Sequence, residues 1–471
     1  MARNKEAPNS WCPLPWTHIS IKNSGVYRIC CHSNVSLEQG ILKDQNKKNL
    51  HISQAKWDSV INSDRMKAVR KNMLKGKWSK ECIRCKREFE TGMNSRNFYE
   101  RNTLAQVIEP ENYPNYMKTK QLTQKDGSIS FKDFPISYLD IRFGNLCNLK
   151  CLMCGPTDSN KWYDDYYQLW QENYFTDHEN TIKLEKTNGA WKTEKNIYNW
   201  SEDPQLWAQI EKHIHTFRKI FIVGGEPLLI KPHYDFLKKC IEKKVSHKLT
   251  IEYNSNITEI PKKAWSLWKH FKTVSFSISL DGFGKVNDLI RYPSQWEKVK
   301  INLDHFDTIG EPFKIIITPS ISVLNIWHLP LFIEYIMKMN YKTIGLFSFP
   351  VLSPHPVHKP SHLNINILTD NFKEKIAEHF KNYKEKISQR DWQAHYGNSH
   401  NYSWEKKINK AAQILDRYIK YMYKTPFSKD QLTKERKTFI YFMDKLDQIR
   451  NTNWKETLPE LYENTLNWRK Y

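Results

Sequence analysis

The chain has 471 residues, of which 39% are hydrophobic and 26% charged, and its formal net charge is +22 at pH 7. This length suggests about three domains and is ample for a large core. No apolar run is long enough to span a bilayer and the first residues begin no signal peptide, so we expect a cytoplasmic protein with no membrane partner. In a reducing compartment, nine cysteines indicate metal or redox use rather than disulfides.

The first part of the chain is rich in cysteine. Residues 25 to 31 have the pattern of the second arm of a hairpin. One thiolate from each of the first two cysteine segments and two from the last would make a four-ligand site, which suits either a structural zinc ion or an iron–sulfur cluster. His32 is expected to be a loop residue. The cysteines concerned are Cys12, Cys30, Cys31, Cys82 and Cys85.

A predicted strand at residues 137 to 143 runs into three closely spaced cysteines. Cys147, Cys151 and Cys154 follow it with the spacing Cys-x-x-x-Cys-x-x-Cys, in the loop at its C-terminal end. Three thiolates can hold a four-iron cluster and leave one iron without a protein ligand, which gives an open coordination site. A zinc site with a distant fourth ligand, or a chance grouping, would give the same spacing.

The connection that follows, residues 155 to 217, is longer than a strand-to-strand crossover needs. It is expected to be a surface helix with an exposed insertion, or a lid. A second strand at residues 218 to 223 then runs into Gly224, Gly225, Glu226 and Pro227. The glycines would let the backbone approach a bound molecule and the glutamate would offer a carboxylate to a cationic group, although the same sequence suits an ordinary turn.

Further strands and helices alternate after this turn. Because strands that alternate with helices form parallel sheets with right-handed crossovers, the pattern predicts an α/β fold. Cys240, in the first of these helices, is expected to be a buried apolar residue. The predicted strands are residues 248–253, 273–280, 313–318 and 342–347, and the predicted helices are residues 231–244, 260–271, 284–307 and 326–339.

The last part of the chain is predicted to be helical. From about residue 370, apolar residues recur at helical spacing, as in 408–423 and 432–449. This region could cap the sheet or receive a partner. Lys and Arg are mixed with acidic residues along the whole chain, which indicates a generally basic surface, while a nucleic-acid partner remains the sharper alternative.

The three cysteines and the Gly-Gly-Glu-Pro segment, each at the end of a predicted strand, resemble the radical S-adenosylmethionine (SAM) superfamily. The resemblance implies a partial (β/α)6 TIM-like barrel. It implies a 4Fe-4S cluster on Cys147, Cys151 and Cys154, whose open iron takes the amino and carboxylate groups of SAM. Glu226, with the Gly224 and Gly225 backbone, would hold the methionyl amino group. Met153 stands where the family usually has an aromatic residue.

The ends of the next two strands also match this family. Asn256 ends the third strand, where the family places a residue near the ribose or methionyl end of SAM. Ser279 and Asp281 end the fourth strand, and Arg291 follows at the family's spacing. By this resemblance, Ser279 and Arg291 would bind SAM hydroxyl or carboxylate groups, and a planar arginine cation suits a carboxylate.

The N-terminal cysteines resemble the auxiliary iron–sulfur domains called SPASM or twitch, which accompany many enzymes of this superfamily. The family's Gly-x-x-x-x-Cys hairpin selects Cys30 over Cys31, so the implied ligands are Cys12, Cys30, Cys82 and Cys85, with zinc as the alternative metal. Such domains usually follow the barrel, whereas this one precedes it. The expected organisation is an auxiliary domain at 1–125, a barrel at 126–350 with its insertion at about 155–217, and a helical region at 351–471.

The resemblance implies reductive cleavage of SAM to a 5'-deoxyadenosyl radical that abstracts hydrogen from a substrate. An external one-electron reductant of the flavodoxin or ferredoxin type would be required. A peptide or protein substrate is favoured because auxiliary domains of this type often accompany peptide modification. The alternatives are a nucleic acid or small metabolite as substrate, or an iron–sulfur or zinc protein without turnover. The sequence does not identify the substrate or the bond changed.

Overall fold

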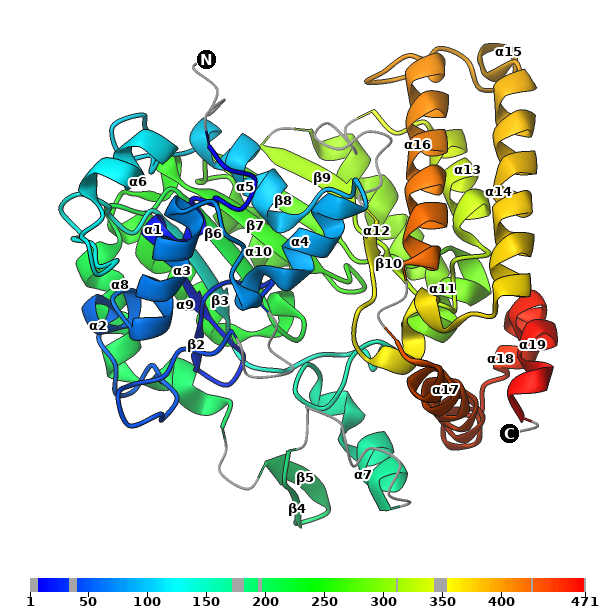
Figure 1. Ribbon diagram of the computed structural model, residues 1–471, viewed down its shortest axis with the longest axis horizontal. Helices are drawn as coiled ribbons and strands as arrows, with labels where there is room; N and C mark the ends of the chain where they lie inside the picture. Colours follow the sequence, from blue (N-terminus) through cyan, green and yellow to red (C-terminus); the bar gives the residue numbers. More distant parts are fainter. Residues whose placement is uncertain are drawn as a thin grey trace. The chain divides into compact units, whose positions relative to one another are not determined.

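The computed structural model describes residues 7–33, 40–171, 182–193, 197–310, 312–342, 354–424 and 427–469 (Figure 1). The chain divides into two compact units. The first comprises residues 1–146, 185–253 and 261–274, and the second comprises residues 147–184, 254–260 and 275–471. Each unit is built from segments that are distant in the sequence.

The central element is a sheet with the strand order β2-β1-β3-β6-β7-β8-β9. β1 pairs with β3, β3 with β6 and β6 with β7, all in parallel, while β1 and β2 form an antiparallel hairpin. The α/β fold with a mostly parallel sheet is therefore confirmed. The strands are β1 (His18–Ile21), β2 (Tyr27–Arg28), β3 (Tyr138–Arg142), β6 (Lys219–Val223), β7 (Thr250–Ser255), β8 (Thr273–Ile278) and β9 (Phe313–Ile317).

One face of the first unit's strands is apolar and buried. Ile220 and Ile222 of β6 and Ile251 and Tyr253 of β7 are all fully buried. The hydroxyl of Tyr253 accepts a hydrogen bond from Trp268 Nε1 at 3.0 Å, so this face is covered by a helix that follows it in the chain. The alternation of apolar and polar residues that predicts these strands is the pattern of a sheet covered on one face by helices.

The opposite face of the same strands carries buried charge. The Asp140 carboxylate accepts a hydrogen bond from Ser20 Oγ at 2.7 Å and lies 3.3 Å from Arg28. Lys219 pairs with Glu252 at 3.0 Å and with Glu100, a residue of helix α5, at 3.4 Å. The N-terminal segment is thus joined to the sheet by a parallel strand and by buried ion pairs.

The N-terminal part of the first unit is otherwise made of short helices. The hairpin turn between β1 and β2 contains Gly25 with φ of +75°, a conformation that favours glycine. This confirms the hairpin predicted from residues 25 to 31. The helices are α1 (Leu14–Thr17), α2 (Trp57–Ile61), α3 (Asp64–Leu74), η1 (Lys80–Cys82), α4 (Ile83–Glu90), α5 (Arg96–Thr103), η2 (Leu104–Gln106) and α6 (Tyr116–Leu122).

The predicted helices between the strands are confirmed, and residues 284–307 form two helices instead of one. The break between α11 and α12 contains Pro293, whose missing N–H cannot continue a helix. Residues 343–347 of the strand predicted at 342–347 lie outside the described part of the chain. The helices are α8 (Pro204–His213), α9 (Lys231–Glu242), α10 (Lys262–Trp268), α11 (Gly284–Ile290), α12 (Trp296–Ile309) and α13 (Leu329–Met339).

The long connection after the cysteines contains a helix and a small hairpin. Helix α7 (Tyr163–Gln171) follows the 3₁₀ turn η3 (Asn160–Trp162), and strands β4 (Leu184–Thr187) and β5 (Ala190–Thr193) form a separate two-stranded sheet. Residues 172–181 and 194–196 of this connection are outside the described ranges. The predicted surface helix is therefore present within residues 155 to 217.

The C-terminal part is helical, as predicted. Figure 1 shows α14 and α16 as an antiparallel pair joined through α15. Their apolar residues at helical spacing, such as Ile376, Phe380 and Leu415, are buried. The helices are α14 (Asp370–Gln389), α15 (Trp392–Tyr396), α16 (Trp404–Tyr423), α17 (Lys429–Arg450), α18 (Trp454–Thr457) and α19 (Pro459–Thr465).

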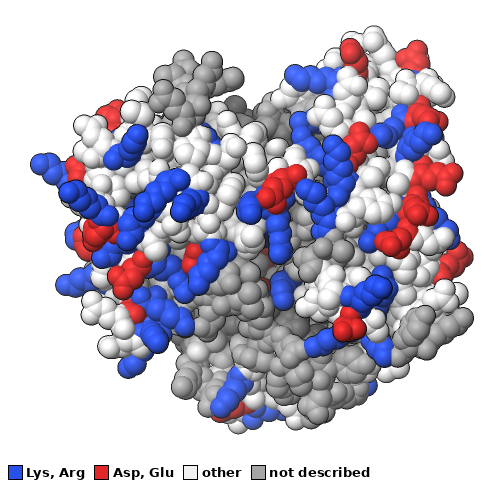
Figure 2. All heavy atoms as spheres, viewed as in Figure 1, with Lys and Arg blue, Asp and Glu red and all other residues white. Residues whose placement is uncertain are grey.

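The surface is basic and mixed in sign. On the face shown in Figure 2, Lys and Arg side chains are interspersed with Asp and Glu rather than gathered in one patch. This distribution suits a generally basic surface better than a compact nucleic-acid site. Among the helices of the described ranges, none combines the length and apolar character needed to cross a bilayer.

Candidate active site and metal centres

The three cysteines of the spaced motif are held in a loop that has few exposed groups. Cys147 and Cys151 are buried, and Met153 and Cys154 pack against them together with Leu149. The Leu149 N–H lies 3.4 Å from Cys147 Sγ and donates to it. A shell of apolar contacts with a backbone donor to sulfur is the environment that an iron–sulfur cluster requires.

The cysteine loop is fixed by polar side chains that sequence reasoning missed. Asn160 Oδ1 accepts from the Cys147 N–H at 3.0 Å, Ser159 Oγ donates to the Leu149 carbonyl at 2.6 Å, and Trp162 Nε1 donates to the Cys151 carbonyl at 3.0 Å. All three follow the loop within a few residues. Their only sequence signal is the Ser-Asn pair before a helix, which is typical of a cap.

The loop is also paired with the segment that follows α11. The Lys150 N–H donates to the Tyr292 carbonyl at 2.7 Å, and the Leu152 N–H donates to the Ile290 carbonyl at 2.8 Å. These bonds bring Arg291 to the loop, where its Nη1 lies 3.9 Å from Cys151 Sγ. The structure therefore places a cation beside one of the three thiols.

A hydrogen bond between the thiols of Cys151 and Cys154 shifts their pKa values in opposite directions. A hydrogen bond from the Cys154 thiol lowers the pKa of Cys151, with burial opposing and Arg291 assisting. The same hydrogen bond, together with burial, raises the pKa of Cys154. The two thiols are thus shifted in opposite directions, and a cluster would bind both of them as thiolates.

Of the residues expected at the ends of β7 and β8, Asn256 meets the same loop and Ser279 lies beside the end of β7. Asn256 Nδ2 donates to Asn148 Oδ1 at 3.0 Å, and Asn148 Nδ2 donates to Thr258 Oγ1 at 2.8 Å. The Ser279 N–H donates to the Ser255 carbonyl at 2.9 Å, so Ser279 lies next to the end of the preceding strand. Asn256 is therefore within contact of the cysteine loop, through an asparagine that the sequence did not single out.

Asp281 orients Arg291. The two side chains form an ion pair with Nε and Oδ2 2.8 Å apart, and Asp281 Oδ1 accepts from the Ser320 N–H at 2.7 Å. Burial raises the pKa of Asp281, with the Arg291 charge opposing. For Arg291, burial lowers the pKa, but the charge of Asp281, followed by the neighbouring Cys151 and Cys154, outweighs it and the net shift is upward. Arg291 is a fixed cation.

The Gly-Gly-Glu-Pro segment in the first unit packs against the residues that precede the cysteines. The Glu226 N–H donates to the Leu146 carbonyl at 2.8 Å. Gly224 and Gly225 both have positive φ, and a Cβ on Gly225 would lie 2.1 Å from the Leu146 oxygen. Glu226 is buried and caps the 3₁₀ helix η5 (Pro227–Leu229). The glycines are therefore needed for close packing against the start of the loop.

Residues 141–319, which contain both motifs, match the family model described as the radical SAM superfamily. Residues 141–319 form a radical SAM domain. This domain is that of a superfamily of enzymes, and a 4Fe-4S cluster with SAM is its implied cofactor set. These residues fit such a cluster. The three thiols can supply its ligands, and the Leu149 N–H and the Arg291 cation lie beside the sulfurs of Cys147 and Cys151.

Some solved structures have a distant likeness to this chain. One is native anSMEcpe with bound AdoMet and Cp18Cys peptide, which is 15% identical with a TM-score of 0.33. The match covers 54% of this chain and 60% of that chain. These structures also include Streptococcus suis SuiB bound to S-adenosylmethionine, at 13% identity and TM-score 0.31 over 79% of this chain and 68% of that chain. SuiB bound to precursor peptide SuiA has 14% identity, TM-score 0.32, and coverage of 79% of this chain and 71% of that chain. The chain thus spans 60% of the length of the anSMEcpe chain.

These identities and TM-scores are too low to carry a substrate or a mechanism to this chain. No match was found among curated protein sequences. The chemistry must therefore be argued from the side chains of this chain.

The N-terminal cysteines lie close enough to influence one another's pKa values. Burial raises the pKa of Cys12, Cys82 and Cys85, and for Cys12 and Cys82 the neighbouring cysteine charges raise it further. Burial, followed by the charges of Cys31 and Cys85, raises the pKa of Cys30 to about 12. Thiols whose pKa values are raised in this way favour the protonated form, and a bound metal cation would favour the thiolates instead.

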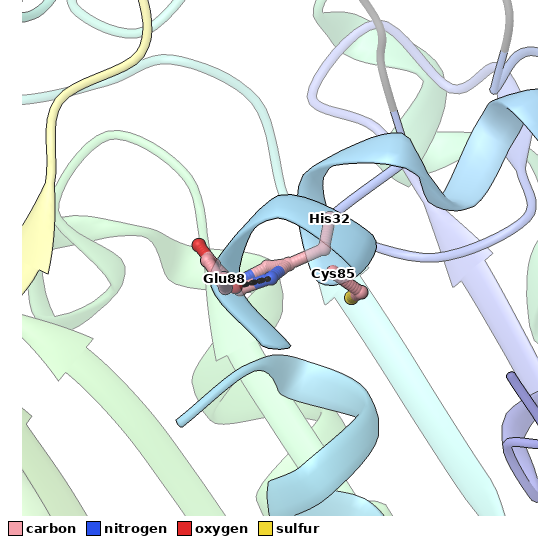
Figure 3. Close-up of side chains that lie close together, drawn as sticks. All are labelled: His32, Cys85 and Glu88. Carbon is pink, nitrogen blue, oxygen red and sulfur yellow. Dashed lines mark ion pairs between the residues drawn. The ribbon is translucent and has the colours of Figure 1, made fainter. Parts of the chain in front are cut away.

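His32 and Glu88 complete this N-terminal cluster, and neither was expected there. Their ligand atoms and that of Cys85 all lie within 4.8 Å of one another. Figure 3 shows the three side chains close together. Glu88 is buried and pairs with Arg84 at 3.0 Å and with His32 at 3.8 Å. We interpret Glu88 as an ion-pair partner that holds helix α4 and the His32 turn around Cys85. The signal for it was the Arg84–Glu88 spacing on one helix.

Proposed function

We propose that the protein is a radical SAM enzyme that cleaves SAM reductively at a 4Fe-4S cluster held by Cys147, Cys151 and Cys154. The observation that supports this most is the buried cysteine loop with Arg291 3.9 Å from Cys151 Sγ. When bound, the cluster supplies the electron that splits SAM into methionine and a 5'-deoxyadenosyl radical, which abstracts hydrogen from the substrate. An external one-electron donor of the flavodoxin or ferredoxin type supplies that electron.

The remaining residues of the proposed site bind and orient SAM. Glu226 accepts hydrogen bonds from the methionyl amino group, with the backbone of Gly224 and Gly225 beside it and Pro227 fixing the turn. Asn256 and Ser279 bind hydroxyl groups of SAM. Arg291 binds its carboxylate and is held in place by Asp281 through the 2.8 Å ion pair. Because a buried carboxylate already fixes this planar cation, the cation loses little conformational freedom when it binds the SAM carboxylate.

We also propose that the sheet is part of a partial (β/α)6 barrel at residues 126–350, preceded by the auxiliary domain at 1–125 and followed by the helical region at 351–471. The alternation of β6, β7, β8 and β9 with helices supports this arrangement. A cofactor at the carboxyl ends of such strands is the usual position in α/β barrels.

For the N-terminal cysteines we propose a second iron–sulfur cluster on Cys12, Cys30, Cys82 and Cys85. Four zinc-bound sulfurs would lie roughly 3.8 Å apart in a tetrahedral site with Zn–S bonds of about 2.3 Å. Among the residues that the structure describes, no three cysteine sulfurs lie within 4.8 Å of one another. The resemblance of these cysteines to auxiliary iron–sulfur domains is what favours a multi-iron cluster here, and a single zinc ion remains the alternative.

The second cluster can be tested by removing the first. In the triple variant Cys147→Ala, Cys151→Ala, Cys154→Ala, we expect about four iron atoms and four sulfides per chain to remain after anaerobic reconstitution. Adding Cys82→Ala and Cys85→Ala should reduce both to background. Iron, sulfide and zinc are measured by elemental and colorimetric analysis. Zinc alone in the triple variant would refute the second cluster.

As substrate we propose a peptide or protein, with a nucleic acid or a small metabolite as the alternative. The paired metal sites support the first, since the auxiliary domains that these cysteines resemble often accompany peptide modification. The mixed surface charge in Figure 2 gives nucleic acid no compact site on that face. Deuterium transfer from a labelled peptide into 5'-deoxyadenosine would support the peptide, and RNA co-purified with the protein would support nucleic acid.

The enzymatic proposal itself rests on one assay. Anaerobically reconstituted wild-type protein, supplied with dithionite and SAM, is expected to form 5'-deoxyadenosine and methionine in equal amounts, as measured by liquid chromatography and mass spectrometry. A reaction without dithionite should give neither product. Intact SAM after full cluster loading would show a metal-binding protein without turnover.

A further inference from the structure

Arg450 is a buried cation at the C-terminal end of α17, far in the sequence from the cysteine motif. Its Nε pairs with Asp165 Oδ2 at 2.7 Å, and both side chains are 1% exposed. The other oxygen of Asp165 pairs with Lys150 Nζ at 2.6 Å. Because Lys150 lies between Cys147 and Cys151, Asp165 links the end of α17 directly to the cysteine loop.

Two aromatic rings contact the Arg450 guanidinium, and both belong to residues that hydrogen-bond to the cysteine loop, Trp162 through its ring and Tyr292 through its backbone. Its Cζ lies 4.5 Å from the Trp162 ring centroid and 5.2 Å from that of Tyr292. Trp162 donates to the Cys151 carbonyl, and the Tyr292 carbonyl accepts from the Lys150 N–H. Cation–π contacts of this kind orient a guanidinium as well as stabilise it. Arg450 therefore has a defined position relative to Cys151.

The charges around Arg450 leave a positive excess. Asp165 carries one negative charge and faces two cations, Lys150 and Arg450. Arg450 Nη1 and Nη2 are buried, and neither has a hydrogen-bond partner among the described residues. Burial lowers the pKa of Arg450, while Asp165 and the Cys151 thiolate oppose this shift. Buried guanidinium donors normally find acceptors, so this pair of N–H groups suits an anionic group at the cysteine loop.

We propose that Arg450 supplies hydrogen-bond donors and positive charge to the cluster at Cys151, and thereby favours its one-electron-reduced state. This inference rests on the proposed function, since it requires a cluster on the three cysteines. Reduction adds one negative charge to the cluster, and a fixed cation in a site that excludes water stabilises the more negative state. Arg291 differs in having a counter-ion of its own, Asp281.

The test is an anaerobic redox titration of the full chain, followed by electron paramagnetic resonance. The signal that changes when SAM is added identifies the cluster on the three cysteines. For Arg450→Gln we expect the ratio of reduced to oxidised cluster at a fixed solution potential to fall about tenfold, which equals about 59 mV for a one-electron couple. Arg450→Lys keeps the charge and should give a smaller shift.

Arg436→Gln is the matched control. Arg436 lies on the same helix, donates to the Ile367 carbonyl at 2.7 Å and stacks on Trp468, so its loss perturbs α17 without approaching the cysteines. An unchanged ratio in Arg450→Gln, an equal shift in Arg436→Gln, or a shift that appears only with SAM present would overturn the inference. If Arg450→Gln binds too little iron for the redox titration, the shift measured for Arg450→Lys decides whether the inference holds. A wild-type protein that binds no cluster would contradict the proposed function instead.

Discussion

Replacing Cys151 with alanine is expected to abolish 5'-deoxyadenosine formation and to remove about four iron atoms per chain. Two thiolates cannot hold the cluster, and the variant also loses the sulfur nearest the Arg291 cation, at 3.9 Å. The measurements are iron content, the visible absorption of the reconstituted protein, and product formation with dithionite and SAM. This is the largest effect that a single substitution should have on activity.

Cys240→Ala is the control for this variant. Cys240 is fully buried in α9, and burial raises the pKa of its thiol. Its loss should cost on the order of 1 kcal/mol in the free energy of unfolding and leave iron and product unchanged. A Cys151→Ala protein that keeps full iron and wild-type product yield would remove the basis of the proposed function.

Gly225→Ala is expected to have the second largest effect, although it changes no ligand. The added Cβ would lie 2.1 Å from the Leu146 oxygen, so the backbone that enters the cysteine loop would have to move. The positive φ of Gly225 adds roughly 1–2 kcal/mol of strain for any residue with a side chain. We expect most of the bound iron and nearly all product formation to be lost, as measured in the same assays.

Gly189→Ala separates the two causes of this loss. Gly189 also has positive φ, in the turn between β4 and β5, but a Cβ there meets no atom within 4 Å. This control carries the backbone strain without the steric clash and should retain cluster and activity. Equal iron loss in both variants would show that general destabilisation, rather than the contact with Leu146, accounts for the result.

The sequence was sufficient to predict the parallel strands and the two main motifs. β3, β6, β7, β8 and β9 lie within one or two residues of their expected positions, because alternating apolar residues and the polar groups at strand ends are local signals. The cysteine spacing and Gly-Gly-Glu-Pro are local for the same reason. The split of residues 284–307 into two helices could have been read from Pro293.

Contacts between distant segments were not predictable. Arg450, Asp165 and Trp162 meet at the cysteine loop only because α17 packs near α7, and nothing in their own surroundings marks them. The same holds for His32 and Glu88 near Cys85. A single sequence gives the residue types at such a cluster but not the tertiary packing that assembles it.

The parallel pairing of β1 with β3 has a consequence for how the protein is made. Ser20 and Asp140, which are bonded across these strands, are 120 residues apart in the chain. During synthesis the N-terminal hairpin has no sheet to join until β3 has left the ribosome, and closing so long a loop is slow compared with local folding. Cys12, Cys30, Cys82 and Cys85 therefore emerge before the strand that fixes their surroundings. For the proposed second cluster, metal loading of these thiols would then compete with their oxidation until β3 has joined the sheet.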